Sequence, residues 1–310
     1  MKKLILAFFL IISAVLLISC DGGVAPKTEG YTFRDALGND VTISEGDKIA
    51  AAHASFADCW LLSGGKLVGV TSDAVEDHGL DVGNALIIGT AKSINREALV
   101  ASGAEMVFLS ADLSAHLELK SVLDSLGIGY AYFRVDTFKD YSELMEHFCA
   151  VTGREDLFKK NVTEVGESIS AIEAKIPTQE GRTLLLMRAF SSGIKAKSDD
   201  NLAGQILKSY GLFNIADAHP SLLEDMGLEH IVSEDPDFIF VLTMGSEESA
   251  LSYLRNNIES NPAFSELKSV KNGNYYVLPK ELFHYKPNKR WAESYEYLAK
   301  ILYPELFTED

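Results

Sequence analysis

The chain has 310 residues and a formal net charge of −17 at pH 7. A surface this acidic repels the phosphate backbone, which argues against nucleic acid as a partner. Three cysteines are too few for a disulfide framework, and the length suits two lobes better than a single core.

The first predicted element is a secretion signal. Two lysines precede an apolar run over residues 4–18, which is shorter than the roughly 18 apolar residues that a spanning helix needs. The run ends in Leu-Ile-Ser-Cys, which resembles the bacterial lipobox, in which the cysteine receives diacylglycerol and becomes the first mature residue. We expect residues 1–19 to be removed, Cys20 to be lipidated and residues 20–30 to form a polar tether. The alternative is an ordinary cleaved signal with a chance cysteine.

A first lobe is expected over residues 31–140. From residue 48 onward, apolar runs of strand length alternate with amphipathic segments of helical length, which predicts parallel sheets with helical crossovers. The expected strands are 49–52, 67–70, 85–88, 106–109 and 130–135. Cys59 and Cys149 are interpreted as buried thiols, although the sequence leaves a bridge between them open.

A connecting helix is expected over residues 141–177, where apolar residues recur at mostly helical spacing and only Gly153 and Gly166 interrupt the interior. The alternation of strands and helices then resumes in a second lobe over residues 178–310. Its expected strands are 183–187, 213–215, 238–242 and 275–278, and its expected helices begin near Leu202, Glu247 and Arg290.

Candidate ligand-binding residues follow the first strand of each lobe, because open parallel sheets bind ligands at the carboxyl ends of their strands. His53, Ser55 and Phe56 follow the first strand of lobe one, and Ser55 has capping-box spacing to Asp58. Arg188 follows the first strand of lobe two, where a guanidinium needs an anionic partner. We therefore expect a cleft between the lobes that takes an anionic, partly apolar ligand.

A third candidate region, residues 281–291, combines aromatic and cationic residues between a strand and the last helix. Loops of this composition often recognise ligands, so His284, Tyr285 and Lys286 are candidates. The alternative is that Pro287 and Asn288 only begin the helix that follows.

Catalytic motifs are absent from the sequence. It contains no Gly-x-Ser-x-Gly elbow, Walker loop, His-Glu-x-x-His or Gly-x-Gly-x-x-Gly, and its seven histidines lack paired metal-ligand spacing. We expect no catalytic residue, no resident metal and no cofactor. His78, beside Glu76 and Asp77, is the best candidate for a bare metal, but a polar turn explains it more simply.

Several longer motifs resemble a known family. They are residues 31–42 (YTFRDALGNDVT), 55–65 (SFADCWLLSGG), 261–264 (NPAF) and 286–291 (KPNKRW). They resemble the substrate-binding lipoproteins that serve ABC importers of iron complexes and cobalamin. The resemblance implies class III architecture, with two Rossmann-like α/β lobes joined by a single long helix, a metal chelate as ligand and no enzymatic activity.

The resemblance also implies a partner. In that family a glutamate near the tip of each lobe forms salt bridges with arginines of the permease dimer. Glu97 and Glu229 match, because each stands seven residues before a dipeptide that leads into a buried strand. Ala104-Glu105 replaces the usual Pro-Asp in lobe one. We expect a monomer, held by its lipid at the outer face of the cytoplasmic membrane, that delivers its ligand to the permease and its ATPase.

The ligand stays open between related chelates. Arg188, Lys195 and Lys286 favour an anionic ferric siderophore or related iron complex, whereas His53, Met187, His284 and Tyr285 suit the iron of haem. Cobalamin is a further alternative of the same type. An extracytoplasmic metal-dependent enzyme or metallochaperone using His53 and Asp58, or a purely structural surface lipoprotein, would be a different class of protein.

Overall fold

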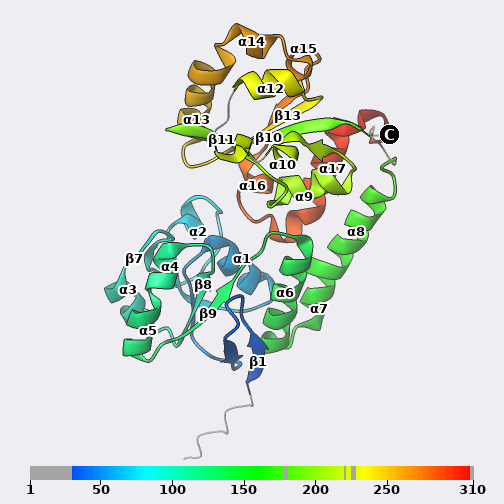
Figure 1. Cartoon of the computed structure of the whole chain (residues 1–310). Coiled ribbons are helices and arrows are strands. Elements are labelled where there is room, and N and C mark those ends of the chain that lie inside the picture. The colour runs from blue at the N-terminus through cyan, green and yellow to red at the C-terminus, as the bar shows by residue number, and fades with distance from the viewer. Residues whose placement is uncertain (1–29, 178–180, 220, 225–227, 308–310) are drawn as a thin grey trace, which may run out of the picture.

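A computed structural model describes residues 30–177, 181–219, 221–224 and 228–307. The chain forms two α/β lobes joined along one side by a helix (Figure 1). The predicted signal, Cys20 and residues 21–29 of the predicted tether lie outside the described residues. Within the described part of the chain, no helix is both long and apolar enough to cross a membrane.

Lobe one opens with a β-hairpin and continues into a parallel sheet of order β5-β4-β3-β8-β9. Its strands are β1 (Tyr31–Arg34), β2 (Asp40–Ile43), β3 (Ile49–Ala51), β4 (Leu67–Val70), β5 (Leu86–Ile87), β6 (Gly89–Thr90), β7 (Ser93–Ile94), β8 (Met106–Ser110) and β9 (Gly129–Phe133). Its helices are α1 (Ala54–Leu62), α2 (Asp73–Glu76), α3 (Arg96–Ala101), α4 (Ser114–Glu118) and α5 (Lys120–Leu126). The five predicted strands are confirmed to within two residues at each end.

Every residue of β3 and of β8 is buried. Strands covered by helices on both faces have no solvent side, so they read as continuous apolar runs rather than alternating ones. This is why the strands of lobe one are recognisable in the sequence.

Lobe two has a second sheet in which β10 pairs in parallel with β12 and β13, and β13 with β14. Its strands are β10 (Thr183–Phe190), β11 (Gly193–Lys197), β12 (Phe213–Asn214), β13 (Phe238–Thr243) and β14 (Tyr275–Val277). Its helical segments are α9 (Leu202–Ser209), α10 (Ile215–Ala218), α11 (Ser221–Glu224), α12 (Leu228–Glu234), α13 (Glu247–Leu254), η2 (Arg255–Glu259), α14 (Pro262–Ser265), α15 (Lys268–Lys271), α16 (Lys280–Phe283), η3 (Asn288–Arg290), α17 (Trp291–Leu302) and η4 (Pro304–Leu306).

The prediction that the first strand of lobe two ends at residue 187, before Arg188, is wrong. β10 continues to Phe190 and turns back antiparallel as β11, so Arg188 lies inside a strand, opposite Lys195. Two serines between Phe190 and Gly193 make the connection, and a two-residue hairpin of this kind carries too little sequence signal to distinguish it from a loop.

The two lobes have equivalent centres. β3 lies between β4 and β8, and β10 lies between β12 and β13, with parallel pairing throughout. α3 leads into β8, and α12 leads into β13. The helices α3 and α12 therefore occupy matching positions in the order of elements of the two lobes.

The link between the lobes begins later than predicted. α6 (Phe138–Thr152) packs against α1 and β1 of lobe one and ends at Gly153, which adopts φ +67°. The link itself is the helical run of α7 (Glu155–Phe158), the π-helical η1 (Lys159–Thr163) and α8 (Glu164–Glu173), and α8 packs against α17. The spacing of apolar residues hid the break, because a left-handed glycine ends a helix without changing that spacing.

Cys59 and Cys149 are both buried and both free, as expected of thiols that act as small hydrophobic residues.

Candidate ligand-binding site

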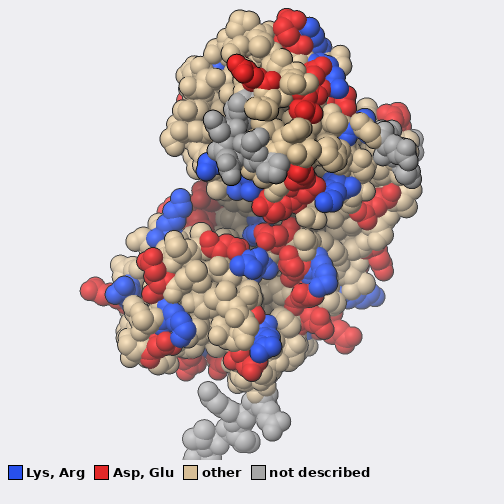
Figure 2. Space-filling model, in the orientation of Figure 1, with Lys and Arg blue, Asp and Glu red and all other residues tan. Residues whose placement is uncertain are grey.

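The candidate site lies at the junction of the lobes, where Figure 2 shows the surface hollowed and bordered by both basic and acidic side chains. α2 of lobe one and α16 of lobe two come near each other there (Figure 1). The rings of His78, just after α2, and Tyr285, just after α16, are 4.5 Å apart between centroids. The ring of His284 and the Nζ of Lys280 also lie beside Tyr285, at 5.1 and 5.6 Å from its centroid. Tyr285 is thus in contact with both lobes.

His53 caps α1 at this junction. The Nδ1 of its imidazole accepts a hydrogen bond from the backbone N–H of Ser55 at 3.3 Å. The predicted capping box between Ser55 and Asp58 is wrong, because the helix begins one residue before Ser55 and His53 takes the capping position. Ser55 and Phe56 are buried within lobe one, and the Phe56 ring lies 4.9 Å from the His53 ring. In this structure the two predicted ligand residues contact His53 from within lobe one: the Ser55 N–H through a hydrogen bond and the Phe56 ring through packing.

Asn288 joins the lobes directly. Its Nδ2 donates hydrogen bonds to the carbonyl of Ser55 at 3.1 Å and to Oδ2 of Asp58 at 2.6 Å. Asn288 is buried and adopts φ +51°, a left-handed conformation that asparagine tolerates better than most residues. Burial raises the pKa of Asp58, whereas the Asn288 hydrogen bond acts in the opposite direction. Asn288 was expected only to begin a helix, and its contact with Asp58 is visible only in three dimensions.

Asn288→Ala should destabilise the protein by about 2–4 kcal/mol, since it leaves the buried Asp58 carboxylate without its amide donor and forces alanine into a left-handed conformation. Asn288→Gly keeps the conformation and loses only the two bonds, so its cost should be smaller, about 1–3 kcal/mol. Urea unfolding of both variants measures the difference. Losses below about 0.5 kcal/mol in both would show that this contact does not hold the lobes together.

Lys286 also bridges the lobes. Its Nζ donates to the carbonyl of Val135 and lies 3.1 Å from a carboxylate oxygen of Asp136, both at the end of lobe one's sheet. The predicted ligand residue Lys286 is therefore already engaged by protein atoms, and it contributes positive charge near the cleft rather than a free ammonium.

Arg188 is a cation near the junction with one buried N–H group that lacks a hydrogen-bond partner among the described residues. The side chain is half-buried, and the N–H group in question is Nε. Burial lowers the pKa of its guanidinium, and the charge of Asp200 offsets this only in part. In β10 its side chain alternates onto the sheet face that holds Leu184 and Leu186. A guanidinium so placed is stabilised by an anion that the protein does not itself supply.

The cations near the junction also lower the pKa of two histidines, His284 and His53. Burial, followed by the charges of Lys280 and Arg188, lowers the pKa of His284 to about 4. Burial, followed by the charge of Lys286, lowers the pKa of His53 to about 4, against the opposing effect of Asp73. Both imidazoles are therefore neutral at pH 7. Because Nδ1 of His53 already accepts the hydrogen bond from Ser55, the proton of that ring lies on Nε2, which can donate to a ligand. The neutral ring of His284 has a lone pair for a hydrogen bond or a metal.

The pH dependence of stability follows from His53. Because its folded-state pKa of about 4 lies below its usual 6.5, the unfolded chain binds the proton first as the pH falls. Stability present above about pH 6.5 should therefore be lost between about pH 6.5 and 4, with a slope of at most about 1.4 kcal/mol per pH unit from this group. Urea unfolding between pH 7 and 5 measures the slope. His53→Asn keeps a capping side chain but cannot titrate, so equal slopes in the two proteins would contradict this origin.

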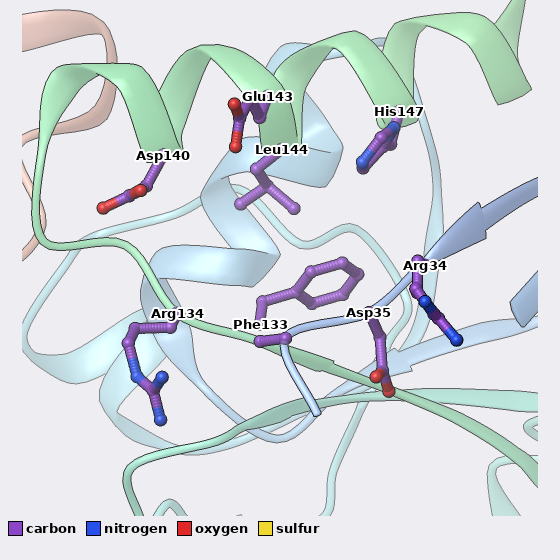
Figure 3. A pocket seen from close by; sticks show the side chains of 9 residues that line it. Arg34, Asp35, Phe133, Arg134, Asp140, Glu143, Leu144 and His147 are labelled. Atoms are coloured by element: carbon purple, nitrogen blue, oxygen red, sulfur yellow. The ribbon is translucent and has the colours of Figure 1, made fainter. Parts of the chain in front are cut away.

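A second cavity, of about 310 Å³, lies between β1, the end of β9 and α6 in lobe one, and Figure 3 shows its side chains. Arg134 there is paired with Asp112 at 2.6 Å, and Asp35 accepts hydrogen bonds from three backbone N–H groups and the Asn39 amide. These groups serve lobe one itself. None of the predicted ligand residues lines this cavity.

No group of three or more histidine, cysteine, aspartate or glutamate side chains suited to a metal ion occurs among the described residues. His78, the best bare-metal candidate in the sequence, instead packs on Tyr285.

Glu97 and Glu229 lie in the first turns of α3 and α12, and both side chains are exposed. They belong to the two equivalent helices, and neither is among the residues that meet at the junction.

Comparison with known proteins decides the family. The model of the family described as periplasmic binding protein matches residues 49–282, which is most of the chain. The chain belongs to the periplasmic binding protein family. Its fold is that of the class III members, with parallel α/β sheets in both lobes. The family consists of extracytoplasmic substrate-binding proteins for transport rather than enzymes, which argues against the enzyme alternative.

Three relatives of this binding protein are informative. The Fe(3+)-citrate-binding protein YfmC of Bacillus subtilis is 21% identical over 289 residues, covering 89% of each chain. Staphylococcus aureus SirA, solved with staphyloferrin B, superposes with TM-score 0.65 at 17% identity, covering 89% of this chain and 98% of that one. S. aureus IsdE, solved with haem, gives TM-score 0.67 at 16% identity, covering 83% and 99%. The resemblance stated from the sequence motifs is thereby confirmed at the level of family and fold.

Sequence reasoning missed three residues of the junction. His78 was treated as a turn residue, Lys280 was not considered, and Asn288 was treated as a helix start. The family motif at residues 286–291 was the sequence signal available for Asn288. It marks the segment as important but does not show that Asn288 is buried.

Proposed function

We propose that this chain is a lipid-anchored receptor that binds an anionic ferric complex, of the siderophore or ferric citrate type, between its lobes and delivers it to an ABC permease. The observation that carries the proposal is Arg188, a half-buried cation whose Nε has no partner among the described residues. Carboxylates and catecholates of iron chelates are anions that a guanidinium can bind with two parallel hydrogen bonds. The named ligand of the relative YfmC is of this class.

The test of the ligand class is a thermal-shift screen of the protein without its first 20 residues. Ferric citrate and a ferric hydroxamate or catecholate should raise its melting temperature and bind one to one, because a ligand that binds only the folded state stabilises it. Haem, cyanocobalamin and free divalent metal ions are tested in the same screen as alternative ligands. A shift with a free divalent ion and with none of the chelates would overturn the proposal in favour of a metallochaperone.

Haem is the second candidate, favoured by the contact of His78 and Tyr285. An imidazole and a phenol are both iron ligands in haem proteins, and here they meet from opposite lobes. A Soret band that moves on binding, and that is lost in Tyr285→Phe, would select haem over the anionic chelate.

The anchor is proposed on Cys20 from the sequence. Cys20→Ser should leave the chain in the soluble fraction, or uncleaved in the membrane, since no diacylglycerol can be attached. Mass spectrometry of the amino-terminal peptide and fractionation of the cells check this. Cys59→Ser is the matched control and should stay membrane-bound. An unmodified Cys20 in the wild-type protein would mean that the signal is an ordinary cleaved one.

Docking on the permease is proposed for Glu97 and Glu229. They are exposed, and they occupy equivalent helices of the two lobes. A pair of matching carboxylates suits a partner built from two similar subunits, each offering a cation.

A further inference from the structure

α3 and α12 share a pattern beyond their glutamates. Residues 97–100 read Glu-Ala-Leu-Val and residues 229–232 read Glu-His-Ile-Val. In both, the third residue is buried, as Leu99 or Ile231, and anchors the helix on its lobe. The fourth residue is exposed: 51% of Val100 and 39% of Val232 is accessible to solvent.

Neither helix propensity nor burial explains why a valine occupies these two positions. Valine forms helices less readily than unbranched residues because its Cβ is branched. A valine side chain that stays in contact with water also contributes little hydrophobic stabilisation. The spacing of three residues, however, places each valine beside the glutamate on the helix surface, one turn further on. Each lobe therefore presents a carboxylate and an apolar side chain together, at an equivalent position in its fold.

We propose that Val100 and Val232 are the apolar half of the docking surface, and that they pack against apolar side chains flanking the cations of a two-fold permease dimer. This inference rests on the docking role proposed for Glu97 and Glu229. An exposed ion pair alone contributes little to affinity, because water screens it. Apolar contact around the pair excludes that water and makes the attraction stronger. The same device in both lobes fits a partner that offers the same surface twice.

Site-specific photo-crosslinking in the full-length chain, expressed in its own cells, tests the inference. A photoreactive residue at position 100 or 232 should form an adduct that mass spectrometry identifies as the permease subunit of an ABC importer. Leu126 of lobe one and Leu306 of lobe two are 44% and 41% exposed and serve as control positions. They should give no such adduct, and equal yields from the controls would overturn the inference.

Two further positions separate this inference from the docking proposal. Arg96 and His230 are exposed beside the glutamates. Permease adducts from positions 96 and 230 but not from 100 and 232 would overturn the role of the valines while supporting the docking of the glutamates. No adduct from any of the four positions would overturn both.

A quantitative measurement completes the test. With the identified permease and its ATPase reconstituted in nanodiscs, Val100→Ser with Val232→Ser should weaken binding of the receptor about tenfold, as expected for loss of apolar contacts around an interfacial charge pair. Leu126→Ser with Leu306→Ser should bind like the wild type. An unchanged affinity in the valine variant would overturn the inference.

Discussion

Arg188→Gln is expected to weaken binding of ferric citrate by about 2–4 kcal/mol, which is about 30- to 1000-fold, without unfolding the protein. The free protein holds a half-buried guanidinium whose Nε lacks a partner and whose pKa is lowered by burial. An anionic ligand removes that unfavourable state when it binds, so the arginine contributes more to affinity than an exposed cation would. Glutamine retains most of the volume but none of the charge.

The stability of the free protein should change in the opposite sense. Because Arg188→Gln removes a cation that the protein does not compensate, unfolding of the ligand-free variant should require as much free energy as the wild type or about 1 kcal/mol more. Isothermal titration with ferric citrate and urea unfolding give the two quantities separately.

Lys195→Gln is the matched control for Arg188. Lys195 stands opposite Arg188 in the β10–β11 ladder, but its side chain is exposed. The control removes the same charge from the same hairpin, and its affinity should stay within about twofold of wild type because solvent screens the lost charge. An equal loss in both variants would mean that general electrostatic attraction, rather than a specific contact of Arg188, holds the ligand.

Charge reversal of both docking residues, Glu97→Lys with Glu229→Lys, should reduce uptake of ⁵⁵Fe supplied as ferric citrate by at least about 100-fold. Two attractive contacts become repulsive, and like charges placed together at an interface cost several kcal/mol. Ligand affinity should be unchanged, because the two helices lie outside the junction residues. The measurement is uptake in cells that carry the variant as their only copy, together with titration of the purified protein.

Two other exposed glutamates provide the control for charge reversal. They are Glu118, in α4 of lobe one, and Glu248, in α13 of lobe two, and both are exposed. Their double reversal changes the net charge by the same amount and should leave uptake near the wild-type rate. Uptake lost equally in the two double variants would point to net charge, and lost ligand affinity in the first would show that Glu97 and Glu229 are part of the ligand site.

The architecture was predictable because it depends on local patterns. Strands β3 and β8 are buried along their whole length and β4 along most of it, and their residues are apolar except for Ser110 at the end of β8, so their position was visible without the fold. The family motifs and the matched spacing of Glu97 and Glu229 are likewise properties of the sequence. What sequence spacing could not show was the break at Gly153 and the hairpin of β10 and β11, where one or two residues redirect the chain.

The details of the site were decided by tertiary structure. Ser55 and Asp58 have capping-box spacing, yet His53 caps the helix, and Asp58 instead binds Asn288, 230 residues away along the chain. Lys286 and Arg188 are both cations near one cleft, but only the environment distinguishes them, since Asp136 pairs with the first and no described group pairs with the Nε of the second. Secondary structure follows from the apolar pattern of neighbouring residues. Whether a polar group is available to a ligand depends on which distant groups the fold has already brought within hydrogen-bonding distance.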